Sequence, residues 1–283
     1  MNPRVVFVLF AASAVAAVAG TTIDSANQYA YGGNIGWVDC RGDTANGAVI
    51  GEYVCSGYLY SANVGWINLG SGTPTNGIYY QNLSADDFGV NQDGLGNLRG
   101  YAYGANIGWI NFENIGAPKV DLASGQMSGF AWSANCGWIS LSNAVAVVQT
   151  DSIQQGALAP DGLPSAWLLR YFGTTNVAAN ADADGDGASN SQEYLAGTDP
   201  TDNSDYLAIT AFGKSFLNYA ITWKSVSTRY YLIQTTLSLS PTGWHDSGLG
   251  LIPSSGLSTA RGLMDTNAPE RYYRIQAVRP LMP

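Results

Sequence analysis

One pattern occurs four times between residues 20 and 148, and this repetition constrains the fold more than any other feature of the sequence. Each copy reads aromatic-x-aromatic, two small residues, Asn-x-Gly-Trp, and then an alternating apolar segment. The four tryptophans lie 29, 43 and 29 residues apart, and the longer interval holds a polar insertion. Repetition at this spacing indicates a repeat domain built from one small unit. The copies are YAYGGNIGWVD from 29, GYLYSANVGWINL from 57, GYAYGANIGWINF from 100 and GFAWSANCGWISL from 129.

Each unit has the pattern of a β-hairpin. In the third copy, Tyr101 and Tyr103 share one face of a strand because they are two residues apart. Asn106 and Gly108 supply turn chemistry, and a second period-2 strand follows from Trp109. One hairpin cannot bury its apolar face alone, so the copies are expected to pack against each other.

The tryptophans of the repeats have two possible roles. They can be core or cross-strand ladder residues, which is the interpretation we favour, since repeated aromatics usually pack together. They can instead form an exposed platform for sugar rings. The residues in question are Trp37, Trp66, Trp109 and Trp138.

The N-terminus has the pattern of an export signal. Arg4 precedes an apolar run, and Ala17-Val18-Ala19 fits a small-x-small cleavage site. We predict a signal peptide at 1–19, the alternative being an uncleaved anchor. Because the apolar run is short and no second one follows, we expect no stable membrane insertion of the mature chain and a secreted or cell-surface location.

Export makes disulfides possible. Cys40 and Cys55 flank a short polar insertion, and a bridge between them would contribute about 3 kcal/mol. The alternative is two free thiols. Cys136 takes the place that Ile35 and Ile107 hold in other copies, so we expect a small buried apolar residue there.

The stretch DADGDGASNSQE at 182–193 has the spacing of a calcium loop. Oxygen ligands are expected at loop positions 1, 3, 5, 7, 9 and 12, with glycine at 6. Carboxylate and carbonyl oxygens suit Ca²⁺, and neither imidazole nor thiolate lies nearby to favour Zn²⁺ or copper. The alternative is an acidic turn without a metal. The predicted ligands are Asp182, Asp184, Asp186, Ala188 through its carbonyl, Asn190 and Glu193.

Two resemblances extend this interpretation. The repeats resemble the tandem GYAW-x-x-N-x-GWI-x-F repeats of secreted bacterial surface proteins. The run GLP-x-x-W…YFG followed by DGDG-x-SN-x-x-EY-x-x-GTDP resembles a calcium module of secreted bacterial proteins, close to dockerin and thrombospondin type 3 loops. The second resemblance implies a structural Ca²⁺. A single complete loop makes a dockerin pairing weak and favours a rigid connector.

The last segment reads as short strands separated by turns, as in a small β-sandwich. The predicted fold class is therefore mostly β: a repeat domain of hairpins, a short EF-hand-like helix-loop-helix connector and a C-terminal sandwich. The predicted domains are 20–150, 151–205 and 206–283.

The sequence predicts a protein that is not an enzyme. His245 is the only histidine, the adjacent Asp246 points to the opposite strand face, and no carboxylate pair stands out. A net charge of −9 disfavours nucleic acid. We expect a calcium-binding structural or adhesion protein of the cell surface whose partners are extracellular polysaccharide or cell-surface proteins. The alternatives are a carbohydrate-binding protein that uses exposed aromatics and, less favoured, a polysaccharide hydrolase.

Overall fold

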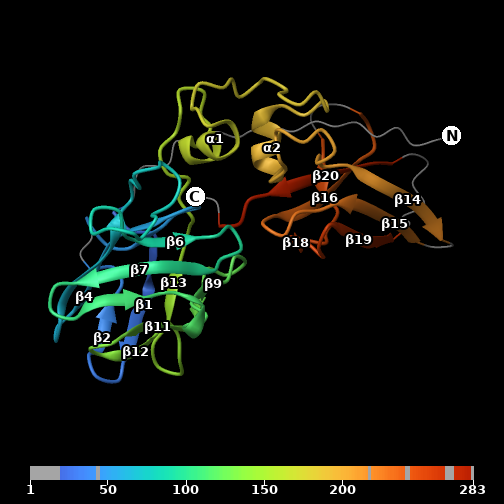
Figure 1. The fold of residues 1–283 in the computed structure, drawn as a ribbon. Coiled ribbons are helices and arrows are strands. Elements are labelled where there is room, and N and C mark those ends of the chain that lie inside the picture. Colours follow the sequence, from blue (N-terminus) through green and yellow to red (C-terminus); the bar gives the residue numbers. More distant parts are fainter. Residues whose placement is uncertain (1–19, 43–44, 216–217, 240–242, 265–270, 282–283) are drawn as a thin grey trace. The chain divides into compact units, whose positions relative to one another are not determined.

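The computed structural model describes residues 20–42, 45–215, 218–239, 243–264 and 271–281. The predicted signal peptide at 1–19 lies outside these residues. The described chain forms two compact units, a repeat unit that runs to Asn176 and includes Leu281, and a C-terminal unit from Val177 to Pro280. The boundary falls inside the segment predicted as a connector, so its first helix belongs to the repeat unit and its loop to the C-terminal unit (Figure 1).

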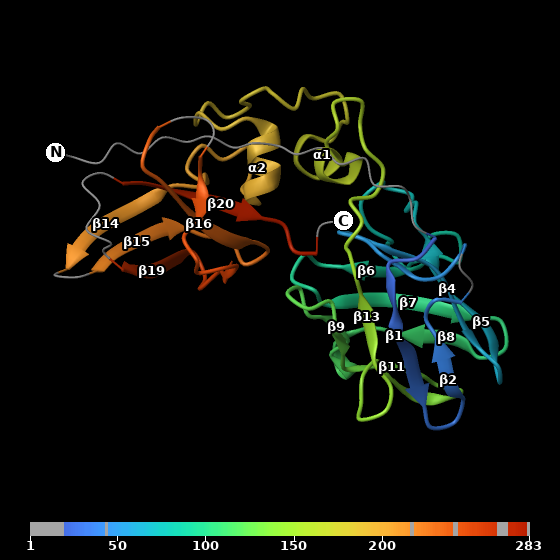
Figure 2. The ribbon, with the colours of Figure 1, turned by 180° about the vertical axis from the view of Figure 1, so that it is seen from behind.

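The repeat unit is an antiparallel barrel of eight strands, and each repeat contributes one hairpin. The last strand pairs back with the first through Tyr31 and Ser140, which closes the barrel. Figures 1 and 2 show the blue-to-green strands from opposite sides. In order around the barrel, the strands are β1 (Ile23–Gly32), β2 (Gly36–Asp39), β4 (Cys55–Ser61), β5 (Gly65–Ser71), β7 (Leu98–Gly104), β8 (Gly108–Asn111), β11 (Phe130–Ser133) and β12 (Gly137–Ser140).

The repeat motif encodes one turn geometry. In each hairpin, the motif glycine follows a three-residue loop and has a left-handed backbone, with φ between +70° and +80°. This is a hairpin loop in which a turn is followed by a left-handed residue, a position that glycine occupies without steric cost. The predicted hairpins are therefore confirmed, and the four glycines are Gly36, Gly65, Gly108 and Gly137.

The barrel interior is aliphatic, and the tryptophans lie outside it. Across each hairpin, an inward residue of the first strand faces a branched residue of the second, as in Ala102 opposite Ile110. An eight-stranded barrel has room for little more than such side chains. The tryptophans are therefore not core residues. Their other expected role, as cross-strand ladder residues, agrees with the register, because each lies opposite an aromatic of its own hairpin, as with Tyr60 opposite Trp66. Trp37, Trp66, Trp109 and Trp138 are 50, 45, 46 and 45% exposed.

Shorter elements complete the repeat unit. β3 pairs with β4, β6 with β7 and β13 with β1, while β9 and β10 form a separate two-stranded sheet. Helix α1 ends in a left-handed glycine, Gly173. The bounds are β3 (Val49–Ile50), β6 (Val90–Gln92), η1 (Asn114–Gly116), β9 (Lys119–Val120), β10 (Met127–Ser128), β13 (Val148–Thr150) and α1 (Ser165–Phe172).

The C-terminal unit holds two antiparallel sheets and helix α2 (Asn190–Ala196). Trp223 and Tyr231 come from different sheets, are fully buried and belong to one apolar cluster. The predicted strands are present, and their face-to-face packing as a sandwich stays a prediction. One sheet contains β14 (Ile209–Ser215), β15 (Asn218–Lys224) and β19 (Ser258–Met264); the other contains β16 (Tyr230–Thr236), β17 (His245–Asp246), β18 (Ile252–Pro253) and β20 (Tyr272–Val278).

Among the described residues, helices are too short or too polar to cross a membrane.

Candidate metal centre

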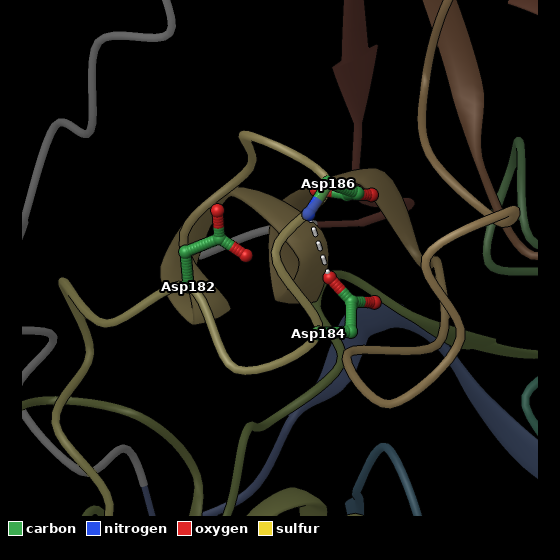
Figure 3. Close-up of side chains that lie close together, drawn as sticks. All are labelled: Asp182, Asp184 and Asp186. Atoms are coloured by element: carbon green, nitrogen blue, oxygen red, sulfur yellow. Dashed lines mark hydrogen bonds between the residues drawn. The ribbon is translucent and has the colours of Figure 1, made fainter.

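The loop before α2 brings three carboxylates together. Each of Asp182, Asp184 and Asp186 offers an oxygen that lies within 4.8 Å of those of the other two. Gly185 and Gly187 have φ of +80° and +97°, and both donate their N–H groups to Asp182 at 2.8 and 2.9 Å. Figure 3 shows the three side chains around the turn, with the Asp186 N–H donating to Asp184. The three aspartates, spaced two residues apart in the sequence, thus form a compact acidic cluster in the structure.

Four oxygen atoms of this loop are buried without a hydrogen-bond partner among the described residues. They belong to four of the six predicted ligands, and each is the kind of oxygen that Ca²⁺ takes. Leaving such an acceptor buried and unpaired costs about 1–3 kcal/mol, and more for a charged group. These four oxygens therefore lack a cationic or donor partner in the part of the chain that the structure describes. The atoms are Asp184 Oδ2, Asp186 Oδ2, Asn190 Oδ1 and Glu193 Oε2.

The site disfavours simultaneous ionisation of its four carboxyl groups, which are those of the three aspartates and Glu193. Burial, followed by repulsion from Asp184 and Asp186, raises the pKa of Glu193 to about 8, although a hydrogen bond from Thr198 opposes the shift. Burial also raises the pKa of Asp184, with the charges of Asp186 and Asp182 adding to the rise and the Asp186 N–H opposing it. A bound divalent cation would reverse this balance by favouring the ionised carboxylates.

The ends of the loop are tied together by the backbone. Asn190 donates its N–H to Ala181 and its side-chain amide to Ala178, at 2.7 and 2.8 Å. Ser189 caps α2 in a reciprocal arrangement with Gln192. These bonds hold Asn190 and Glu193 in the first turn of the helix, directly after the aspartates in the chain. Ala188 donates its N–H to Asp186, and the role of its carbonyl as a ligand stays a prediction.

The C-terminal end of α2 is held by an arginine that immediately precedes β16. Arg229 is buried and donates to the carbonyls of Tyr194 and Leu195, at 2.7 and 2.9 Å. A cation at a helix C-terminus satisfies carbonyls that have no partner within the helix. The Arg279 guanidinium lies 4.8 Å from the ring centre of Tyr194. The loop therefore sits on a framework of α2, β16 and β20.

The structure differs from a helix-loop-helix at the entry side. Helix α1 ends at Phe172 and belongs to the repeat unit, and turns rather than a helix lead from Val177 into the loop. The exit helix is present as predicted. The sequence between α1 and the loop, TTNVAANA at 174–181, lacks an apolar repeat that could extend α1 to the loop.

The predicted Cys40–Cys55 disulfide is absent, and both residues are buried free thiols. The strand register explains the difference. Asp39 pairs with Tyr60, so Cys40 comes opposite residue 59, four positions from Cys55. Four residues of strand span about 13 Å, whereas bridged cysteines need Cα atoms within about 7 Å. Cys136 is buried, as expected for its place in the repeat.

The four tryptophans carry ring contacts on the outside of the barrel. Trp66 packs edge-on against Tyr58 and at a tilt against Tyr60, with ring centres 6.2 and 4.9 Å apart. Trp109 packs on Tyr101 and Tyr103 at the same two distances. The predicted platform residues are thus exposed and form one aromatic cluster for each repeat.

Sequence reasoning missed two features next to these sites. Thr198 contacts Glu193, and the only signal for it is the threonine that follows Gly197 after the helix. Phe88, in the polar insertion, packs against Trp109 with ring centres 5.1 Å apart. A lone aromatic in a polar insertion could have indicated such a contact.

A comparison with known proteins finds no matching family model, no matching curated protein and no matching solved structure.

Proposed function

We propose that this chain is a non-catalytic calcium-binding protein of the extracellular surface, with a structural or adhesive role. The observation that carries the proposal is the group of four buried oxygens without partners at 182–193. Their donor types and spacing fit Ca²⁺, which takes six to eight oxygen ligands. The surface location rests on the export pattern of the sequence.

Calcium would act here as a structural ion. It would neutralise the carboxylates of Asp184, Asp186 and Glu193, whose charges otherwise repel each other. Because Glu193 lies on α2 and α2 packs on β20, binding would link the loop to the core of the C-terminal unit. A ligand that binds only the folded state stabilises that state by mass action.

Thermal unfolding of the full chain tests this role. Calcium at 1 mM is expected to raise the unfolding temperature of the C-terminal unit relative to EDTA, and Asp184→Asn is expected to remove most of the increase. Asp202→Asn is the matched control, because it removes one charge nine residues after Glu193, from a carboxylate that accepts hydrogen bonds from Ser204 alone among the described residues. Equal unfolding temperatures in calcium and EDTA would contradict the proposal.

A second candidate function, carbohydrate binding, is supported by the exposed tryptophans of the barrel. The four tryptophans of the barrel are about half exposed, and each lies beside aromatic neighbours. Exposed aromatic faces of this kind favour carbohydrate binding, because the apolar face of a sugar ring stacks on them. The repeat unit would then be the part that holds an extracellular polysaccharide.

A further inference from the structure

A groove lies beside the tryptophan of the third repeat. The polar insertion between β5 and β7 folds back so that its residues face Trp109 and Tyr101. The resulting groove has a volume of about 410 Å³ and is also lined by Asn82, Ser84 and Phe88. Binding clefts for small ligands typically measure about 300–1,000 Å³.

The wall of the groove is held in place by hydrogen bonds within the insertion. The carboxylate of Asp87 accepts from the N–H and the hydroxyl of Thr75 and from the N–H of Gln81, at 3.0, 3.0 and 3.1 Å. Asn82 donates its N–H to the Asp87 carbonyl and accepts the Gly89 N–H, each at 3.0 Å. A wall ordered in advance lowers the entropy cost of binding a ligand.

Phe88 packs beside the aromatic cluster of the third repeat and forms part of the groove wall. Its ring is perpendicular to the Trp109 indole, at 81°, and also contacts Tyr103. Trp66, in the second repeat, has the same two tyrosine contacts as Trp109 and is equally exposed. One wall of the groove therefore comes from the insertion, and the other comes from the repeat residues Tyr101 and Trp109.

The chemistry of the lining selects a neutral ligand with one apolar face and one polar edge. None of the described residues that line the groove is charged, so an anionic ligand such as phosphate would have no cation to meet it. The indole and phenol rings offer π faces, and the exposed Ser84 adds a hydroxyl to the lining, whereas the Asn82 amide bonds to Gly89 and Tyr80 within the wall. A pyranose ring presents this combination, with C–H groups on its face and hydroxyls on its edge.

We propose that the groove beside Trp109 is the site at which this chain binds neutral sugar units of a polysaccharide. The proposal rests on the second candidate function above and locates it in one repeat. The other three tryptophans would contribute little to affinity. Loss of one stacking ring at such a site is expected to weaken binding at least about tenfold.

Affinity electrophoresis of the full chain tests the proposal, with laminarin, xylan, galactomannan and hydroxyethylcellulose each included in native gels. Wild type is expected to be retarded by at least one of them. Trp109→Ala and Phe88→Ala should weaken this binding at least tenfold, and the matched control Trp66→Ala should leave it within twofold. Phe88→Ala leaves every barrel strand unchanged, and equal unfolding temperatures verify that all variants fold.

Two results would overturn the proposal in distinguishable ways. If wild type is retarded but Trp109→Ala and Phe88→Ala bind as well as wild type, or Trp66→Ala loses as much as they do, the groove is not the site and carbohydrate binding by the aromatic surface survives. If none of the four polysaccharides retards wild type, both the groove and the second candidate function are overturned.

Discussion

Asn34 in the first repeat donates its side-chain amide to the carbonyl of Cys136 in the fourth repeat, at 3.1 Å. The other three motif asparagines do the same to the repeat before them, each at 3.0 Å. The four bonds form a closed ring at the hairpin turns, and the Asn34 bond joins the two ends of the repeat array. The other bonds run from Asn63 to Ile35, from Asn106 to Val64 and from Asn135 to Ile107.

Breaking this ring should destabilise the barrel. We expect Asn34→Ala to lower the free energy of unfolding of the repeat unit by about 1 kcal/mol, because one hydrogen bond between the first and last repeats is lost. Urea unfolding followed by tryptophan fluorescence measures the change. Asn176→Ala is the control, since its exposed side chain bonds to no other described residue. Equal losses in the two variants would show that the ring contributes nothing specific.

The first hairpin turn offers a test of the repeat glycine. Gly36 has φ of +73°, and a Cβ there would lie 3.2 Å from the amide nitrogen of Asn63. We expect Gly36→Ala to cost about 1–2 kcal/mol through backbone strain and pressure on the ring. Gly33→Ala, three residues earlier in the same turn, has open space and should be neutral. The account of the turn fails if the two substitutions have the same effect on chemical denaturation.

The reactivity of the cysteine thiols tests whether Cys40 and Cys55 are free rather than bridged. Burial raises the pKa of both Cys40 and Cys55 to about 12, with the charge of Asp39 adding to the shift at Cys40. At pH 8 these thiols should resist Ellman's reagent in the folded chain, because the thiolate is the reactive form. In denaturant without reductant, three thiols per chain should react. A count of one would mean that Cys40 and Cys55 are bridged.

The raised pKa values of the two thiols also predict how the stability of the folded chain changes with pH. A folded-state pKa above the unfolded value means that the folded state binds protons more tightly. The stability contributed by Cys40 and Cys55 is therefore complete below about pH 9 and is lost as the pH rises through about 12. Replacing both with alanine should flatten this alkaline loss in urea midpoints measured between pH 9 and 11.

Arg229 should couple α2 to the sheet. Arg229→Met removes the donors to Tyr194 and Leu195 and should destabilise the C-terminal unit by about 2 kcal/mol. Arg261→Met is the control, since its guanidinium bonds to the carbonyl of the adjacent Ala260. Differential scanning calorimetry of the full chain measures both variants. Unfolding of Arg229→Met at the wild-type temperature would contradict this role of the arginine.

The hairpins and the proposed metal ligands can be predicted from the spacing of residues within short stretches of the sequence. The hairpins follow from a turn motif of a few residues, and the proposed ligands between Asp182 and Glu193 follow from the positions of a single loop. In both cases the residues that meet in space are close in the chain. Their geometry therefore depends little on the rest of the fold.

The features that sequence reasoning missed depend on distant contacts. Both faces of each repeat strand are apolar, as with Tyr103 beside Ala102, and only closure of a narrow barrel decides that the small residue points inward. Register places Cys40 away from Cys55. Phe88 reaches Trp109 because Asp87 ties the insertion together.

The most direct test of the central claim is isothermal titration of calcium into the full chain after removal of metal with EDTA. The account predicts one site per chain in wild type and in Asp202→Asn. It predicts at least a tenfold loss of affinity in Glu193→Gln, whose carboxylate is fully buried beside the aspartates. Absence of saturable binding in wild type, or unchanged affinity in Glu193→Gln, would contradict the assignment of 182–193 as a calcium site.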